Sequence, residues 1–301
     1  MILGNTGTMG SALERINVEF KTLDGSTLRG WIFPATKGGP AMIMSPGFNM
    51  PKDATLPDLA VWFQEHGITC LLYDPRGIGS SDGEPRHDID ARRQAEDLHD
   101  AVTWLKESPW VDENKIALWG LCFGGNVTLA AAAFDKRVAA MISIAPLVDA
   151  TGLENRQQPI LELAMHDRVN RLNGEEPMYL PYINEDGSIP NGLQMPSEMM
   201  PALARLGIEV ENRVSVQTYY RALSWNILNI VHHISPTPVM MVTPEFDVSC
   251  PTKDQLECYD HIKEPKELDI LKGKGHIDWI FGDFESILER QLDFLKRRMV
   301  F

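Results

Sequence analysis

The segment from Leu118 to Gly125 constrains the fold more than any other part of the chain. An apolar, strand-like run ends there in Gly-Leu-Cys-Phe-Gly-Gly, and a helical pattern of small residues follows from Asn126 to Phe134. A turn this tight forces its central residue, Cys122, into a strained backbone conformation, and the flanking glycines remove side chains that would collide there. The sulfur should then stand at the helix N-terminus, where the helix dipole favours a thiolate. The pattern is that of a nucleophile elbow with cysteine at its centre.

Strand and helix patterns alternate along most of the chain around this elbow. Residues 15–23 and 28–33 alternate between polar and apolar and predict an opening antiparallel pair. Short apolar runs typical of buried parallel strands then alternate with amphipathic helix patterns. The predicted strands are 40–44, 68–73, 115–119, 137–144, 238–242 and 268–271, and the predicted helices are 57–66, 88–106, 126–134, 253–261 and 284–298. This order predicts an α/β sheet, mostly parallel, with helices on both faces.

The predicted domain organisation is one core with one insertion. A chain of 301 residues fits a domain of about 200–250 residues with an inserted segment. Residues 1–14 are small and polar and are expected to be flexible, whereas residues 15–146 and 236–301 carry the alternating core patterns. Residues 147–235 are instead helical, rich in methionine and interrupted by proline. Because they stand between two core strands, we expect them to form a helical lid above the strand ends.

Composition excludes several classes of function. Lys and Arg number 28 against 42 Asp and Glu, which gives a net charge of −14 and argues against nucleic-acid or anionic-membrane partners. No apolar run approaches the roughly 20 residues of a membrane span, and no secretory signal begins the chain. The four cysteines lack metal-ligand spacing, and His232-His233 have no third ligand spaced with them. We therefore expect a reduced, cytoplasmic setting and neither a metal nor a cofactor.

A cysteine nucleophile needs a base to take its proton and a third group to orient that base. His276 follows the predicted strand 268–271 through a flexible loop, and Asp247 follows the predicted strand 238–242. Sites in open α/β sheets form outside the carboxyl ends of the strands, and Cys122 lies there as well. The chain order is nucleophile, acid, base. Glu245, two residues before Asp247, is the alternative acid.

These motifs resemble those of the α/β-hydrolase superfamily over about residues 15–298. The loop Tyr73–Ser81 resembles the loop that precedes the elbow region in these enzymes, and Ser45-Pro46-Gly47-Phe48 resembles their His-Gly-x oxyanion turn. The elbow itself is similar to the cysteine elbow of dienelactone hydrolases. Residues 211–220, 236–240 and 275–279 look closer to fungal polyketide transferases and thiohydrolases, which release or transfer polyketide acyl chains from carrier-protein thioesters.

The resemblance implies a role for each candidate residue. Cys122 would be the nucleophile, His276 the general base and then acid, and Asp247 the carboxylate that orients it. Cysteine in place of serine disfavours amide hydrolysis, because a thiolate leaves more readily than a poor amine leaving group. It favours thioester substrates, because acyl-Cys122 is itself a thioester and the exchange is nearly isoenergetic.

The resemblance also implies an oxyanion hole made by the backbone N–H groups of Phe48 and Phe123. Removing one such donor typically costs about 100- to 1,000-fold in rate. Ser45-Pro46 replaces the usual histidine before the oxyanion glycine, which leaves Asn49 as an alternative to Phe48.

Residues of the predicted lid supply candidates for a substrate pocket. Tyr219, Tyr220, Trp225 and Met199 would make an adaptable apolar surface for an acyl chain above the nucleophile. The alternative is that the methionines and aromatic residues only fill a loosely specified lid core.

The favoured function is acyl transfer in secondary metabolism, by a polyketide thiohydrolase or acyltransferase. Its expected partners are a small-molecule acyl substrate and an acyl carrier domain of a polyketide synthase, although carriers are usually acidic and the net charge of −14 fits them poorly. One alternative is a carboxylester or lactone hydrolase of the dienelactone hydrolase type. Another, from a different class, is a non-catalytic hydrolase-fold binding protein, against which the intact nucleophile, acid and base candidates argue. Nothing in the sequence indicates the oligomeric state.

Overall fold

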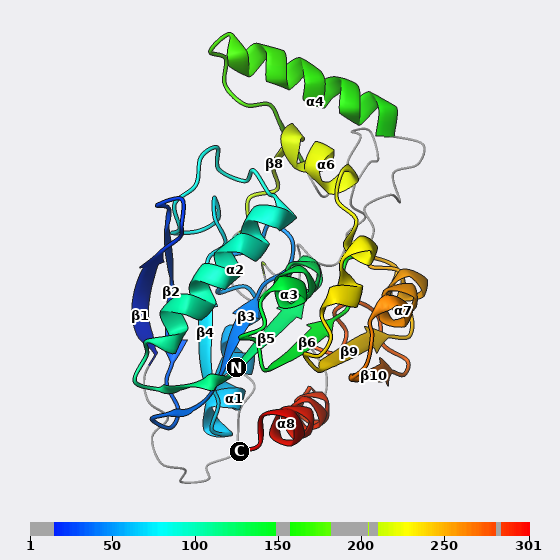
Figure 1. The fold of residues 1–301 in the computed structure, drawn as a ribbon. Helices are drawn as coiled ribbons and strands as arrows, with labels where there is room; N and C mark the ends of the chain where they lie inside the picture. The colour runs from blue at the N-terminus through cyan, green and yellow to red at the C-terminus, as the bar shows by residue number, and fades with distance from the viewer. Residues whose placement is uncertain (1–14, 149–156, 182–203, 205–209, 281–283) are drawn as a thin grey trace.

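The structure is a computed structural model that describes residues 15–148, 157–181, 204, 210–280 and 284–301. Its centre is an eight-stranded sheet in the order β1-β2-β4-β3-β5-β6-β9-β10 (Figure 1). The strands are β1 (Ile16–Lys21), β2 (Thr27–Phe33), β3 (Gly39–Ser45), β4 (Thr69–Tyr73), β5 (Val111–Leu121), β6 (Ala140–Ile144), β9 (Val239–Pro244) and β10 (Lys266–Leu271). β2 pairs antiparallel with β1 and β4, and the remaining neighbours are parallel.

Helices cover the sheet on both faces. β4, β6 and β9 are buried along their whole length, as expected of parallel strands that lie between two helical layers. The helices of the core are α1 (Pro57–Glu65), α2 (Ala91–Lys106), α3 (Phe123–Phe134), α7 (Thr252–His261) and α8 (Glu285–Met299). α2 and α3 lie side by side across the sheet in Figure 1, whereas α1 packs on β4 and α8 on β6. The predicted fold class is confirmed.

Local capping explains one boundary that the sequence pattern misplaces. The pattern predicts a helix from residue 88, but α2 begins at Ala91. Asp90 adopts an extended conformation, and its carboxylate accepts hydrogen bonds from the N–H groups of Arg92 and Arg93. The side chain thereby satisfies backbone donors that the first helical turn leaves unpaired.

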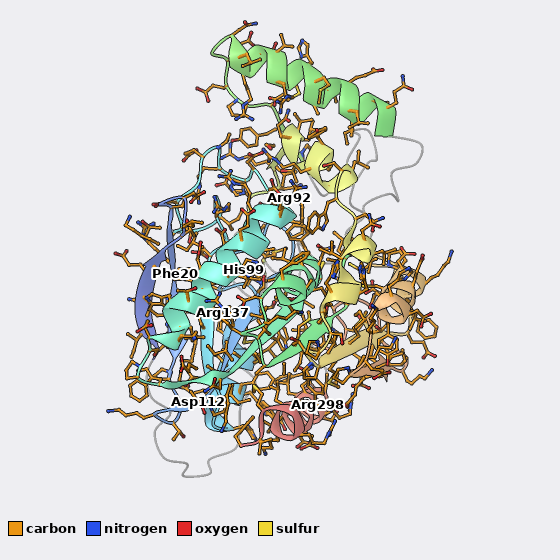
Figure 2. The ribbon with its side chains drawn as sticks, in the orientation of Figure 1. Phe20, Arg92, His99, Asp112, Arg137 and Arg298 are labelled. Carbon is orange, nitrogen blue, oxygen red and sulfur yellow. The ribbon has the colours of Figure 1, made fainter. Side chains whose placement is uncertain are left out.

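Polar contacts near the C-terminal end of α3 hold that helix against α2. Nδ1 of His99 lies 3.2 Å from the Asp135 carboxylate, with which Arg137 forms an ion pair at 2.6 Å (His99 and Arg137 are labelled in Figure 2). Arg137 also donates a 2.7 Å hydrogen bond to the Thr103 hydroxyl of α2. These contacts fix the far end of the helix whose N-terminus carries the elbow.

The described part of residues 147–235 lies outside the central sheet. It comprises α4 (Gln157–Leu172), β7 (Tyr179–Leu180), β8 (Val214–Ser215), α6 (Val216–Leu223), η1 (Ile227–Asn229) and η2 (Val231–His233). α4 packs on α6 and lies farthest from the sheet in Figure 1. The Gln217 side chain joins the two helices by donating to the Ala164 carbonyl and the Asp167 carboxylate, at 2.7 and 2.8 Å. That this insertion acts as a lid stays a prediction, and residues 1–14 lie outside the described part.

None of the helices in the described ranges is long and apolar enough to cross a membrane.

Candidate active site

Cys122 stands in a strained turn between β5 and α3. Its backbone has φ 57° and ψ −119°, a conformation that residues with a side chain rarely adopt and that costs about 1–3 kcal/mol. The surrounding backbone holds it there: the Cys122 N–H donates to the Ile144 carbonyl at 2.9 Å, and its carbonyl accepts from the Leu147 N–H at 3.1 Å. Strand β6 and the chain after it therefore lock the elbow.

Two glycines make this close approach feasible. A Cβ atom added to Gly120 would lie 2.3 Å from the Gly124 carbonyl oxygen. A Cβ added to Gly124 would lie 2.3 and 2.4 Å from the carbonyl oxygens of Ser45 and Pro46. The elbow thus packs directly against the turn after β3, and no side chain fits between them.

His276 and Asp247 meet beside this elbow, as the sequence predicts from their places after β10 and β9. Nδ1–H of His276 donates to Oδ2 of Asp247 at 2.8 Å, and both side chains are almost fully buried. The Asp247 carboxylate also accepts from the N–H groups of Ser249 and Cys250, at 3.0 and 2.8 Å, and from Nε2 of Gln255 at 3.0 Å. These donors hold the carboxylate toward the imidazole.

The alternative acid, Glu245, has other partners. Its carboxylate accepts from Nζ of Lys272 and from the Gly273 N–H, both at 2.9 Å. The structure therefore brings Asp247, rather than Glu245, to His276.

Cys250 brings a second sulfur to the site. Its Sγ lies 3.7 Å from Sγ of Cys122, and one His276 ring nitrogen lies within 4.8 Å of both sulfurs. From the sequence, Cys250 lies three residues after Asp247 and could approach the site, although packing is the role expected for it. Gln255 has no predicted role, because it is indistinguishable from an ordinary residue of α7.

Electrostatics favour an ion pair between Cys122 and His276. The hydrogen bond from the Cys250 thiol, together with the positive charge of His276, holds the pKa of Cys122 well below its ordinary value although burial opposes this. Burial alone would lower the pKa of His276, but the Cys122 thiolate and the hydrogen bond to Asp247 raise it to about 10. Burial raises the pKa of Cys250, which stays a thiol and serves as the donor. Cys122 is therefore a thiolate, whereas His276 is an imidazolium and Cys250 a thiol.

The turn after β3 lies against the nucleophile. A Cβ added to Gly47 would lie 3.8 Å from Cβ of Cys122, and the rings of Phe48 and Phe123 meet edge to face with centroids 5.4 Å apart. The roles of the Phe48 and Phe123 N–H groups as oxyanion donors stay predictions.

The side chain of Asn49 is engaged with other groups, whereas the role of Asn49 as the alternative to Phe48 in the oxyanion hole stays a prediction. Its amide donates to the carbonyls of Glu211 and Arg213, at 3.0 and 3.3 Å, and its Oδ1 lies 2.8 Å from Nδ1 of His87. It therefore ties the chain before β8 to the turn.

Two recesses adjoin Phe48. The first recess is lined by Cys122 and His276 together with apolar side chains such as Met50 and Ile277. The second recess is lined by Phe123, Leu147, Trp225 and residues of α6. Their apolar walls suit a hydrocarbon chain better than a charged ligand.

The predicted pocket residues have different surroundings. Trp225 lines the second recess; its Nε1 donates to Oδ1 of Asn126 at 2.9 Å, and its ring lies 5.9 Å from the guanidinium of Arg92, labelled in Figure 2. Tyr219 is buried, with its hydroxyl 3.3 Å from the Pro181 carbonyl, and Tyr220 is exposed. Neither tyrosine lines these two recesses. The fourth predicted residue, Met199, lies outside the described residues.

Comparison with known proteins places the chain among its relatives. The family model described as X-Pro dipeptidyl-peptidase (S15 family) matches residues 33–278. The chain is 79% identical over 291 residues to the polyketide transferase grgF of Penicillium sp., covering 97% of this chain and 99% of the relative. It is 40% identical over 289 residues to a thiohydrolase of Eupenicillium brefeldianum, covering 94% of each.

A solved structure extends the likeness to three dimensions. The α/β-hydrolase GrgF from Penicillium sp. superposes with a TM-score of 0.93 at 79% identity, covering 96% of this chain and all of that one. These relatives are named as enzymes, which argues against the non-catalytic alternative. The chain is therefore an enzyme of the α/β-hydrolase superfamily and belongs to its family of polyketide transferases and thiohydrolases.

Proposed function

We propose that Cys122 takes an acyl group from a thioester and passes it to water or an alcohol, with His276 moving the proton and Asp247 orienting the imidazole. The observation that carries this proposal is the buried arrangement of Asp247, His276 and Cys122, with a 2.8 Å hydrogen bond between the first two and the sulfur at a strained helix N-terminus. A nucleophile, a base and an orienting carboxylate are the parts that covalent acyl transfer needs.

The first half of the reaction uses the ion pair. The Cys122 thiolate attacks the thioester carbonyl, and the N–H groups of Phe48 and Phe123 stabilise the oxyanion that forms. The bond between the acyl carbon and the donor sulfur breaks, and the imidazolium of His276 gives its proton to the departing thiolate. The products are acyl-Cys122, a free thiol and a neutral imidazole.

The second half restores the enzyme. Neutral His276 takes a proton from water or an alcohol, whose oxygen attacks the acyl carbon of acyl-Cys122. The bond to Sγ breaks, and the enzyme returns to a Cys122 thiolate beside a His276 imidazolium. The product is a carboxylic acid when water attacks and an ester when an alcohol attacks.

The relatives support a polyketide acyl chain as the cargo. The relatives include polyketide transferases and thiohydrolases, and the second recess places the apolar side chain of Trp225 near Phe48 and Phe123, where it would contact an apolar acyl chain. We propose that the donor is a thioester held on an acyl carrier domain, which the chain binds chiefly through the acyl group, because a net charge of −14 disfavours attraction to an acidic carrier.

Intact-mass analysis tests the proposal. The wild-type enzyme is incubated with a panel of acyl thioesters, simple esters and lactones, and the expected result is an acyl adduct from thioesters that maps to Cys122. Cys122→Ala should form no adduct and lose turnover. Cys258→Ala is the matched control, because Cys258 is also buried but lies on α7 outside the site, and it should label like the wild type.

Other outcomes would point elsewhere. Labelling by lactones but not by thioesters would favour the dienelactone hydrolase alternative, and full turnover by Cys122→Ala would refute nucleophilic catalysis by this residue.

A further inference from the structure

Three side chains able to bind a metal meet at the elbow although they follow three different strands. The sulfurs of Cys122 and Cys250 and a ring nitrogen of His276 all lie within 4.8 Å of one another, and all three residues are buried. It is the one such group of three or more among the residues that the structure describes. No spacing in the sequence indicates it, because the three residues come together only through the folds of separate loops.

The separation of the two sulfurs fits a tetrahedral metal ion. Zinc binds thiolate sulfur at about 2.3 Å, so two sulfurs at adjacent corners of a tetrahedron around it lie about 3.8 Å apart. The observed separation between Sγ of Cys122 and Sγ of Cys250 is 3.7 Å. Thiolate and imidazole are the ligands that select zinc over harder ions such as Mg²⁺ or Ca²⁺, which take oxygen ligands.

The Asp247 carboxylate would orient the imidazole of His276 toward the ion. Nδ1 of His276 is held by the Asp247 carboxylate at 2.8 Å, which leaves Nε2 as the metal-binding nitrogen. A carboxylate behind the histidine is the usual outer-shell partner of a zinc-bound imidazole. Cys122 and His276 also line the first recess, so the fourth ligand position of the ion would face that recess.

We propose that Cys122, Cys250 and His276 form a binding site for one Zn²⁺ ion, and that zinc bound there inhibits the enzyme. The inhibitory part rests on the proposed function. Coordination engages the sulfur of Cys122 that must attack the thioester and the nitrogen of His276 that must carry the proton. Cys250 binds as a thiolate and His276 through an unprotonated Nε2, so Sγ of Cys250 and Nε2 of His276 each release one proton to solvent when the ion enters.

Zinc titration of the reduced, substrate-free enzyme against a chromophoric chelator tests the site. The expected result is one ion per chain with a dissociation constant of about 1 µM or lower. Co²⁺ in place of Zn²⁺ should produce the charge-transfer absorption of a cobalt–thiolate bond. Cys250→Ser should weaken zinc binding by at least about 100-fold, and Asp247→Asn by about 10- to 100-fold, the usual effect of losing an outer-shell partner.

Cys258→Ser is the matched control, because Cys258 is a buried cysteine of α7 that lies outside the cluster, and it should bind zinc like the wild type. Turnover of a thioester by the wild type should fall over the same range of zinc concentration and recover with excess chelator. Absence of binding, equal binding by Cys250→Ser, or full turnover by the zinc-loaded enzyme would overturn the proposal.

The test separates this proposal from the acyl-transfer proposal, because binding is measured without substrate. An enzyme that binds zinc as described but never turns over thioesters would refute only the proposed reaction. An enzyme that turns over thioesters and does not bind zinc would refute only the site.

Discussion

Among single residues, Cys250 has the largest effect on how Cys122 ionises. Its thiol lies 3.7 Å from Sγ of Cys122 and is the leading reason for the lowered pKa of the nucleophile. Hydrogen bonds to charged groups stabilise them by about 1.5–3 kcal/mol, and sulfur donors lie at the weak end. Removing the donor should therefore raise the pKa of Cys122 toward its ordinary value.

The pH dependence of alkylation of Cys122 by iodoacetamide measures this pKa. We expect the midpoint to move upward in Cys250→Ala and to stay near the wild-type value in Cys250→Ser, whose hydroxyl keeps a donor. Cys258→Ala controls for loss of a buried cysteine elsewhere. An unchanged midpoint in Cys250→Ala would show that His276 alone stabilises the thiolate.

The ion pair also predicts the shape of the pH–rate profile. Below the lowered pKa of Cys122 the sulfur is protonated and cannot attack, so turnover falls with decreasing pH from a midpoint well below that of a free thiol. Above about pH 10 His276 loses the proton that the departing thiolate needs, so turnover falls again. We expect kcat/KM for an uncharged thioester to be flat between these limits. A rate that keeps rising through the ordinary pKa of a thiol, about 8.5, would contradict the ion pair.

Among the elements, the elbow depends on the absence of a side chain at Gly124. An alanine there would place its Cβ 2.3 Å from the Ser45 carbonyl oxygen, and backbone atoms cannot move aside as a flexible side chain can. We expect Gly124→Ala to lower the free energy of unfolding by more than about 3 kcal/mol. Urea unfolding followed by circular dichroism measures the change.

Gly38→Ala is the control for this prediction. Gly38 has φ +65° but nothing within 4 Å of an added Cβ, so its replacement adds only backbone strain, of about 1 kcal/mol. If Gly38→Ala and Gly124→Ala lower the free energy of unfolding equally, the elbow must relax around the added methyl group.

The contact between Trp225 and α3 predicts how acyl chains are selected. Trp225 lines the second recess, and its indole N–H bonds to Asn126 of the elbow helix. Trp225→Ala should therefore raise KM for long acyl thioesters by about tenfold, since each apolar side chain of this size contributes more than 1 kcal/mol when buried, and should leave acetyl thioesters nearly unaffected. Tyr220→Ala on the same segment is the control, because Tyr220 is exposed and lines neither recess. Equal KM changes for long and short chains would place the acyl group elsewhere.

Elements were easier to predict from the sequence than contacts between loops. The core strands are apolar and lie between turn signals, so both their order and the strand-end positions of Asp247 and His276 follow from the pattern. The pattern missed the start of α2, because the capping geometry of Asp90 competes with helical periodicity. It places Cys250 near Asp247 but does not predict the contact between the sulfurs of Cys250 and Cys122, because that contact depends on how the loop after β9 folds back. The orientation of the Tyr219 side chain likewise depends on packing outside the sheet, which no local sequence pattern reveals.

For the whole molecule, the sheet topology explains why residues so distant in sequence form one site. β5, β6, β9 and β10 are neighbours and parallel, so their carboxyl ends open on the same edge. Cys122 follows β5, Asp247 follows β9 and His276 follows β10. Because β6 separates β5 from β9, the loop that carries Asp247 and Cys250 must reach back over the end of β6. This loop, residues 245–251, places Cys250 rather than Asp247 against the nucleophile Cys122.

The charge of the whole molecule predicts how a carrier-bound donor is used. A net charge of −14 repels an acidic carrier domain over a distance set by the Debye length, about 30 Å at 10 mM salt and about 10 Å at 100 mM. We expect kcat/KM for a thioester on an acidic carrier to rise severalfold between these salt concentrations. For the same acyl group on a small neutral thiol, kcat/KM should not change with salt. The comparison therefore distinguishes an effect on the encounter with the carrier from an effect on the chemical step. If kcat/KM with the carrier instead falls as salt increases, the enzyme must present a local positive docking surface that outweighs its net charge.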